Sequence, residues 1–353
     1  MNNFEAKFEF FASANGQNGF KSYFSEIFNS EDYSKIFVLK GGPGSGKSTL
    51  MKKVARFAEE RGLNYEVFRC SSDINSLDAV IINSGEKRIA VLDGTAPHER
   101  DAKIPGAVDE LINLGVAWSV ECLERERAKI EELNAMKSEC YIQAYAYLRN
   151  YSVFARNIKA EIKKYYNSSK LKEAIKKIIN SGNFKSDSSG GVRLVSSFSK
   201  DGYRKLPTLE KVSSRAYYVF GEHCTDKIFI TALAQKLSEM GVKFTKVPSP
   251  IDEELLEAIY FRDSGTYISC GCEGEILYDT TELFEKDDYM LLTKKASILE
   301  GSMKIYSELA KDEFLGASEY HFKLEEIYKS AVDFKTLDKI CENLIFKIEK
   351  TLL

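Results

Sequence analysis

One stretch constrains the fold more than any other: residues 36–62 read IFVLKGGPGSGKSTLMKKVARFAEERG. Residues 36–39 form a short apolar run that is typical of a strand buried on both faces of a parallel sheet. A glycine-rich segment follows, and residues 48–61 are good helix formers that stop at Gly62, a common helix terminator. The stretch therefore predicts a strand, a tight loop and a helix in an α/β fold.

The glycine-rich segment has the spacing of a phosphate-binding loop, with Gly41 separated by four residues from Gly46, Lys47 and Ser48. Glycines are needed because the loop must turn its backbone N–H groups inward around phosphate oxygens. We expect Lys47 to face solvent and reach the β- and γ-phosphates, and the Ser48 hydroxyl to ligate Mg²⁺. The predicted nucleotide-binding residues are Gly41, Gly42, Pro43, Gly44, Ser45, Gly46, Lys47, Ser48 and Thr49.

A second apolar strand ends in a carboxylate at residues 88–94, RIAVLDG. Asp93 stands where a Walker B strand offers an acid to the magnesium shell, so Ser48 and Asp93 are the predicted metal ligands. The alternative is that Asp93 and Gly94 only form a turn at a strand end. Because Gly94, and not a second acid, follows Asp93, no adjacent carboxylate can activate a water, and hydrolysis is expected to be slow or to need a partner.

Asp73 is a candidate catalytic residue because it lies just beyond the predicted strand 64–69, where ligands of open α/β sheets collect. It could orient an attacking water or hydroxyl. It also precedes an apolar-periodic segment through Val80 whose pattern predicts a helix, so the alternative is an N-cap. The loop after Asp93 offers further polar candidates: Thr95, His98, Glu99, Arg100 and Asp101.

The second half of the chain repeats the first. Gly221 aligns with Gly41 and Lys227 with Lys47 at a constant offset. The sequence predicts an N-terminal unit, 1–185, with a helical hairpin at about 106–180, and a second unit, 192–353, with a helical segment at about 288–353. Residues 180–191 have linker composition. Further aligned pairs are Gly62 with Gly241, Tyr65 with Phe244, Asp73 with Asp252, Leu77 with Leu256, Gly94 with Gly271, Ser13 with Ser196, and Gly19 with Gly202.

The second half loses the residues that chemistry requires. Cys224 and Asp226 replace Gly44 and Gly46, Ile228 replaces Ser48, and Cys270 replaces Asp93. An acid at 226 would repel phosphate, so this half is expected to bind no nucleotide. Lys227 is then expected to project into solvent or to pair with an acid, and its replacement by alanine to be nearly silent. Asp252 persists there, at the head of a segment interpreted as helical, which favours the capping role of Asp73.

Charge and hydropathy constrain the partners. The formal net charge of −3 gives no support for nucleic acid as a partner. Residues 156–185 nevertheless hold nine Lys or Arg against two acids, with tyrosines nearby, which leaves nucleic-acid stacking possible; the alternative is a solvated lysine face over a tyrosine-rich core. No secretion signal or membrane-length apolar run is evident, so we expect a cytoplasmic protein that does not enter membranes. The sequence names no protein partner.

The motifs resemble those of the P-loop NTPases and, within them, an uncharacterised group of bacterial tandem P-loop ATPases. The resemblance lies in residues 11–15, 39–48, 70–73, 92–98 and 105–110, and the alignment covers essentially the whole chain. It implies an α/β fold of P-loop NTPase-like parallel sheets, internally duplicated, each half followed by a long helical segment. The second loop departs from the tandem pattern of the group.

The resemblance implies ATP as the nucleotide, and the absence of an Asn-Lys-x-Asp guanine-reading motif agrees with it. Three functions stay open at this point. The first is a Mg²⁺-dependent ATPase that moves the helical hairpins or a partner, with Lys47, Asp93 and Asp73 as catalytic candidates. The second is a small-molecule kinase in which Asp73 accepts the acceptor's proton. The third is a nucleotide-responsive binding module with little turnover.

Overall fold

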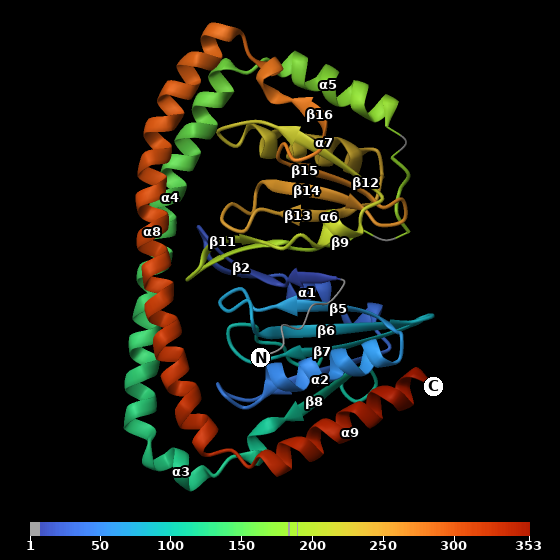
Figure 1. Cartoon of the computed structure of the whole chain (residues 1–353), viewed down its shortest axis with the longest axis vertical. Coiled ribbons are helices and arrows are strands. Elements are labelled where there is room, and N and C mark those ends of the chain that lie inside the picture. The colour runs from blue at the N-terminus through green and yellow to red at the C-terminus, as the bar shows by residue number, and fades with distance from the viewer. Residues whose placement is uncertain (1–7, 183, 189) are drawn as a thin grey trace.

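The computed structural model describes residues 8–182, 184–188 and 190–353. Two six-stranded sheets lie one above the other in Figure 1, and two long helices run along one edge of both. The predicted linker, 180–191, leads from the first half of the chain to the second. Asn183 and Ser189 within it lie outside the described residues.

The first sheet is built from the N-terminal half and has the strand order β1-β5-β6-β7-β4-β8. β4 lies between β7 and β8 and is parallel to both. The carboxyl end of β4, where the glycine-rich segment begins, is therefore beside the carboxyl end of β7. The strands are β1 (Glu9–Phe11), β4 (Lys35–Lys40), β5 (Asn64–Arg69), β6 (Leu77–Ser84), β7 (Lys87–Asp93) and β8 (Asp109–Asn113).

The second sheet has the same topology. Its order, read from the other edge, is β9-β13-β14-β15-β12-β16, so each strand has a counterpart in the first sheet. A short antiparallel hairpin also precedes β4 and its counterpart β12: β2 (Ser13–Gly16) with β3 (Gly19–Ser22), and β10 (Ser196–Ser199) with β11 (Gly202–Lys205). The strands are β9 (Gly191–Val192), β12 (Arg215–Phe220), β13 (Thr245–Pro248), β14 (Leu256–Phe261), β15 (Thr266–Cys270) and β16 (Glu275–Asp279).

The two sheets share details of strand pairing. β5 and β6 shift register between Phe68 and Arg69, and β13 and β14 do so between Val247 and Pro248. In both repeats the glycine after the strand end donates its N–H to a carbonyl oxygen of the strand that leads into the loop. Gly94 donates to Leu39 of β4, and Gly271 donates to Val219 of β12. The alignment of the two halves is thus reproduced in space, which is consistent with an internal duplication.

The sheets differ from the expectation in being mixed. β6 is antiparallel to both β5 and β7 because a two-residue turn at Gly85 folds β6 back onto β7. The segment through Val80 was interpreted as helical, and so was the segment after Asp252, but β6 and β14 occupy these positions. The β-branched residues of these strands are buried on both faces of the sheet. The apolar residues therefore show neither the two-residue alternation of a half-buried strand nor a helical spacing that would distinguish the two structures.

Two long helices form the edge common to both repeats. α4 (Arg127–Tyr165) and α8 (Lys286–Ser330) pack side by side and run in opposite directions (Figure 1). The first predicted hairpin begins later than 106 because β8 and a short 3-10 helix occupy 109–117. The other helices are α1 (Phe24–Ile27), η1 (Ser30–Asp32), α2 (Lys47–Glu60), η2 (Leu114–Ala117), α3 (Val120–Arg125), α5 (Ser168–Ser181), α6 (Thr208–Val212), α7 (Thr225–Glu239), η3 (Thr280–Leu283) and α9 (Phe334–Leu352).

The repeats exchange their terminal helices. α5, which ends the first repeat, buries Ile175 against Phe229 and its neighbours on α7 of the second repeat. α9, which ends the second repeat, buries Leu344 and Ile348 in the core around Met51 of α2. Figure 1 shows α9 beneath the first sheet and α5 above the second. The sequence boundary near 185–192 therefore separates the repeats but not the packing units.

One hydrophobic core joins the two sheets. It contains Phe10 and Phe68 from the first repeat together with Leu194 and Tyr260 from the second. Because each sheet buries one face in this shared core, neither repeat has a complete core alone. The burial of apolar area in this core is a main contribution to holding the repeats together.

A buried charge cluster also crosses this junction. Glu66 lies 2.9 Å from Arg193 and 3.0 Å from Arg262 of the other repeat. Burial opposes ionisation of Glu66, but the two guanidinium groups outweigh it and lower its pKa to about 2. The carboxylate is thus charged at neutral pH and fixes the relative position of the two repeats.

The first hairpin uses its tyrosines for packing. Tyr145 lies 5.9 Å from Phe314 of α8, ring centre to ring centre, and belongs to a small core between α4 and α8. Lys159 and Lys170 pair with acids of the second repeat. These contacts favour the alternative of a lysine face over a tyrosine core. Among the described residues no helix combines the length and the apolar character needed to cross a membrane.

Candidate functional site

The first loop, residues 41–46, connects β4 to α2 with a backbone that only glycine adopts easily. Gly44 has φ 67° and Gly46 has φ 81°, both in the left-handed region. Gly46 is the N-cap of α2 and has no side chain to bond the first helical N–H groups. These groups therefore remain available to an anion at the positive end of the helix dipole.

Lys47 is folded back onto the loop. Its Nζ donates to the carbonyl oxygens of Gly41 at 2.5 Å and Gly42 at 3.0 Å, and it lies 3.5 Å from Asp93 Oδ2. Its side chain is only 13% exposed, so the expectation that Lys47 faces solvent is wrong. The ammonium group lies inside the loop and donates hydrogen bonds to two carbonyl oxygens. An anion such as phosphate could accept these hydrogen bonds in place of the carbonyls.

Asp93 ends β7 directly beside the first loop. The register pairs it with Leu39 of β4, and its Oδ1 accepts hydrogen bonds from the N–H and hydroxyl of Thr95. Burial raises the pKa of Asp93 above its usual value, although Lys47 opposes the shift. Asp93 therefore organises the turn at the strand end and also faces the lysine, so the two interpretations of this residue are compatible.

The remaining residues of the glycine-rich segment differ in burial and in their hydrogen bonds. Ser45 is buried and donates to the carbonyl of Gly42, whereas Thr49 is exposed on α2. Ser48 Oγ accepts the N–H of Leu77, the first residue of β6, at 3.0 Å. This bond ties the start of α2 to the strand beside β7.

Two residues beside the first loop carry the kind of oxygen ligand that Mg²⁺ prefers. Ser48 offers a hydroxyl and Asp93 a carboxylate oxygen facing Lys47. The described residues contain no group of three or more His, Cys, Asp and Glu side chains arranged around a metal position. Mg²⁺ usually takes one or two protein ligands and completes its shell with phosphates and water, so the donor set fits a nucleotide-bound ion.

Asp73 does not cap a helix. Its carboxylate accepts the N–H of Asn75 inside the turn between β5 and β6, and Asp252 accepts the N–H of Glu254 in the matching turn. The N-cap interpretation is wrong because a strand follows each turn. A local turn-forming role explains why the aspartate is present in both repeats.

The loop after β7, residues 94–108, is held by two buried ion pairs. Arg100 lies 3.0 Å from Asp109, with both side chains almost fully buried, so its guanidinium is committed to the fold. His98 Nε2 lies 3.1 Å from Asp78 Oδ2, and both are buried. Asp101 is 95% exposed beside Lys40.

Sequence reasoning missed Asp78. It is the second residue of β6, and the register that pairs Ala79 with Leu92 places Asp78 opposite Asp93 one step further on. A buried acid inside the apolar run 77–82 was the signal, and it was overlooked because the run was interpreted as helical. Two carboxylates thus lie side by side at the end of the sheet.

Sequence reasoning also missed that the second repeat covers the first loop. The elbow between α8 and α9, residues 325–337, lies against it: a Cβ on Gly44 would be 2.7 Å from the carbonyl oxygen of Glu325. A Cβ on Gly42 would be 3.2 Å from the Tyr328 ring and 3.5 Å from Trp118. Backbone bonds from Ser119 to the elbow, and from the elbow back to Ala117, hold it there.

The second loop, residues 221–226, differs from the first in its backbone and in the partner of its lysine. α7 begins at Thr225, two positions earlier than α2 in the alignment, and Cys224 takes the left-handed conformation with φ 63°. Lys227 Nζ lies 2.7 Å from the buried Glu257 carboxylate. Cys270 occupies the register position of Asp93, because it pairs with Val219 as Asp93 pairs with Leu39.

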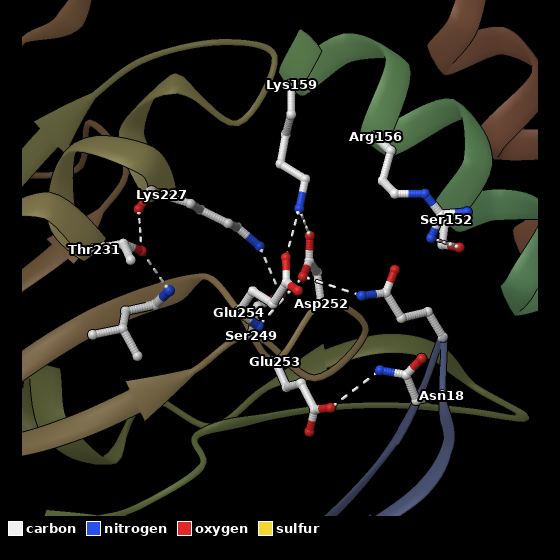
Figure 2. A network of polar contacts seen from close by, with 12 residues as sticks. Asn18, Ser152, Arg156, Lys159, Lys227, Thr231, Ser249, Asp252, Glu253 and Glu254 are labelled. Carbon is white, nitrogen blue, oxygen red and sulfur yellow. Dashed lines mark hydrogen bonds and ion pairs between the residues drawn. The ribbon is translucent and has the colours of Figure 1, made fainter. Parts of the chain in front are cut away.

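α4 seals the second loop from the side. Figure 2 shows Lys159 reaching from α4 to Asp252, at 2.8 Å, whereas Lys227 is directed towards Ser249. Asn18 of the β2–β3 turn joins the group through Glu253. The basic and acidic groups here pair with each other, Lys159 with Asp252 and Lys227 with Glu257.

Comparison with known proteins supplies no relative. No protein-family model matches the chain, and neither the curated proteins nor the solved structures contain a match. Function is therefore inferred from the backbone and side chains of the two loops.

Proposed function

We propose that the chain binds one nucleoside triphosphate, ATP with Mg²⁺, at the first loop and hydrolyses it to move the helical hairpins or a partner. The observation that carries this proposal is the loop itself: two glycines in the left-handed region, an uncapped helix start, and Lys47 next to Asp93. These are the parts of a P-loop, whose N–H groups and lysine bind phosphate oxygens.

The residues around the first loop would have distinct roles in binding phosphate and metal. The N–H groups of the loop and of the first turn of α2 orient the phosphates, and Lys47 exchanges its two carbonyl partners for phosphate oxygens. Ser48 and Asp93 would hold Mg²⁺, which neutralises charge on the phosphates during transfer.

The covering elbow supports coupling to the hairpins. A nucleotide at the first loop would lie against residues of the second repeat, since Glu325 and Tyr328 approach Gly44 and Gly42. These residues belong to α8, which packs along α4 over most of its length. A change in the elbow on binding or hydrolysis would therefore be transmitted along both long helices.

Calorimetric titration with a non-hydrolysable ATP analogue and Mg²⁺ tests the binding half of the proposal. The expected stoichiometry is about one nucleotide per chain, because only the first loop keeps its phosphate ligands. The fluorescence of Trp118, the only tryptophan, should change at the same ligand concentration because its ring lies against the loop. No heat and no fluorescence change would refute the nucleotide site.

A phosphate-release assay tests the turnover half. Phosphate release from ATP with no added acceptor is the expected result for an ATPase. Release only when a metabolite from an acceptor panel is present would identify a small-molecule kinase instead. Tight binding with no release under either condition would identify a nucleotide-responsive module.

A further inference from the structure

Each repeat places one buried carboxylate at the same position. Asp78 is the second residue of β6 and Glu257 is the second residue of β14. The register puts Asp78 opposite Asp93, and it puts Glu257 opposite Cys270, one step beyond the pair Ala258 and Ser269. Both carboxylates are almost fully buried, so each needs a cationic or hydrogen-bonding partner.

In the second repeat this carboxylate captures the loop lysine. Glu257 Oε1 lies 2.7 Å from Lys227 Nζ, and Oε2 accepts hydrogen bonds from Ser196 and Tyr203. Burial disfavours the charged lysine, but the Glu257 carboxylate outweighs burial and raises the pKa of Lys227. A lysine held in this way is not free to bind a phosphate.

In the first repeat the equivalent carboxylate pairs with a histidine and not with the loop lysine. His98 Nε2 lies 3.1 Å from Asp78 Oδ2, while Lys47 bonds the loop carbonyls. The His98 ring stacks on Phe24 at 4.6 Å and meets the edge of Phe20 at 5.1 Å, so its position is fixed by packing. Burial opposes protonation of His98, but Asp78 outweighs it and raises the histidine pKa.

The histidine comes from a loop that the second repeat lacks. Residues 94–108 connect β7 to β8, whereas residues 271–274 alone connect β15 to β16. The charged groups that act on His98 are Asp78, Asp93 and Lys47. In the first repeat, therefore, the buried Asp78 has His98 as a separate cationic partner, and Lys47 remains free of Asp78 and able to bind phosphate.

We infer that His98 is a positioning residue: by pairing with Asp78 it prevents that carboxylate from capturing Lys47 and keeps the lysine ready for phosphate. The inference rests on the proposed nucleotide site. It assigns a role to a buried ion pair that touches neither nucleotide nor metal. The second repeat displays the arrangement that results when no such histidine is present.

A double-mutant cycle of His98→Ala and Asp78→Asn tests the inference by affinity for the non-hydrolysable ATP analogue. His98→Ala should weaken binding about tenfold, because Asp78 then pairs with Lys47. Adding Asp78→Asn should restore affinity to within about threefold of the parent, and Asp78→Asn alone should also stay within about threefold. This pattern is strongly non-additive.

Additive effects would overturn the inference. If Asp78→Asn alone strengthens binding by the factor that His98→Ala weakens it, the pair acts only through net charge. If His98→Ala changes nothing, or if Asp78→Asn fails to rescue it, His98 has no such role. If the parent chain itself binds no nucleotide, the proposed function fails first, and that result is distinct from the other three.

Two further variants separate positioning from folding. Arg100→Ala breaks the other buried ion pair of the same loop, and Asp78→Asn should not rescue any loss of affinity that it causes. If circular dichroism shows that His98→Ala does not fold, His98→Phe replaces it in the cycle, because phenylalanine keeps the contact with Phe24 but cannot pair with Asp78. The same rescue by Asp78→Asn is then expected.

Discussion

The two loops occupy the same place in two copies of one topology, yet their lysines do different things. Lys47 bonds exchangeable carbonyl oxygens beside Asp93, whereas Lys227 forms an ion pair with the buried Glu257. Both lie at the start of the helix that follows the central parallel strand. The comparison teaches that the partner of the lysine, and not its presence, separates a ligand site from a structural ion pair.

The largest expected effect concerns Lys227, and it differs from the silent substitution expected from the sequence. Lys227→Ala leaves Glu257, which is 4% exposed, charged and without its partner. Loss of one partner of a buried pair costs 3–5 kcal/mol, and because Lys227 is 28% exposed we expect about 3 kcal/mol of lost stability. Urea unfolding of parent and variant measures the difference.

A matched double variant separates the cost of leaving Glu257 charged and unpaired from the other effects of replacing Lys227. Lys227→Met with Glu257→Gln removes both charges and should lose much less stability than Lys227→Ala, because no unpaired charge remains. Nucleotide affinity should stay at the parental level in both variants. An unchanged unfolding midpoint in Lys227→Ala would contradict the assignment of a structural ion pair.

Lys47→Ala should abolish most nucleotide affinity. Hydrogen bonds to charged groups contribute about 1.5–3 kcal/mol each, so loss of the ammonium is expected to weaken binding about a hundredfold. Calorimetry with the ATP analogue and Mg²⁺ measures the loss, and circular dichroism checks the fold. Binding as tight as in the parent would place the nucleotide elsewhere, and a second binding event sensitive to Lys227→Ala would show that both loops bind.

Asp93→Ala should act mainly through the metal. With Mg²⁺ we expect phosphate release to fall about tenfold or more, whereas binding of nucleotide in EDTA should change by less than about threefold. Cys270 has replaced this acid in the second repeat, in the same register position. Equal losses with and without Mg²⁺ would instead show that Asp93 acts only through its bonds to Thr95.

The sequence predicted the strand, the glycine loop and the helix that follows because their determinants are local. A loop that needs left-handed glycines, a helix start and a strand-end acid is encoded within residues 36–62 and 88–94, and the structure brings these residues together. The duplication was also predictable, because spaced glycines such as Gly62 and Gly241 mark the same helix ends with φ 64° and 76°.

The missed features depend on contacts that are distant in the sequence. The antiparallel β6 could not be separated from a helix by its apolar run, and so Asp78 was overlooked. The elbow over the first loop joins Glu325 to Gly44, and nothing local to either residue encodes that contact. The exchange of α5 and α9 is invisible for the same reason, since Ile175 and Ile348 pack in cores of the other repeat.

The smallest expected effects belong to Asp73 and decide its open catalytic role. Asp73 is partly exposed, and among the hydrogen bonds described for it the carboxylate accepts only the N–H of Asn75, whereas the Asp252 carboxylate also pairs with Lys159. If both aspartates are turn formers, Asp73→Ala should cost about 0.5–1 kcal/mol of stability, the worth of one ordinary hydrogen bond. Phosphate release should then stay within about twofold of the parent, since a general base contributes about a hundredfold or more. Asp252→Ala should cost more stability because it frees Lys159 as well, and it should leave phosphate release equally unchanged. A loss of turnover in Asp73→Ala alone, with parental nucleotide affinity, would make Asp73 the base and would separate the two repeats at a position where their turns otherwise look alike.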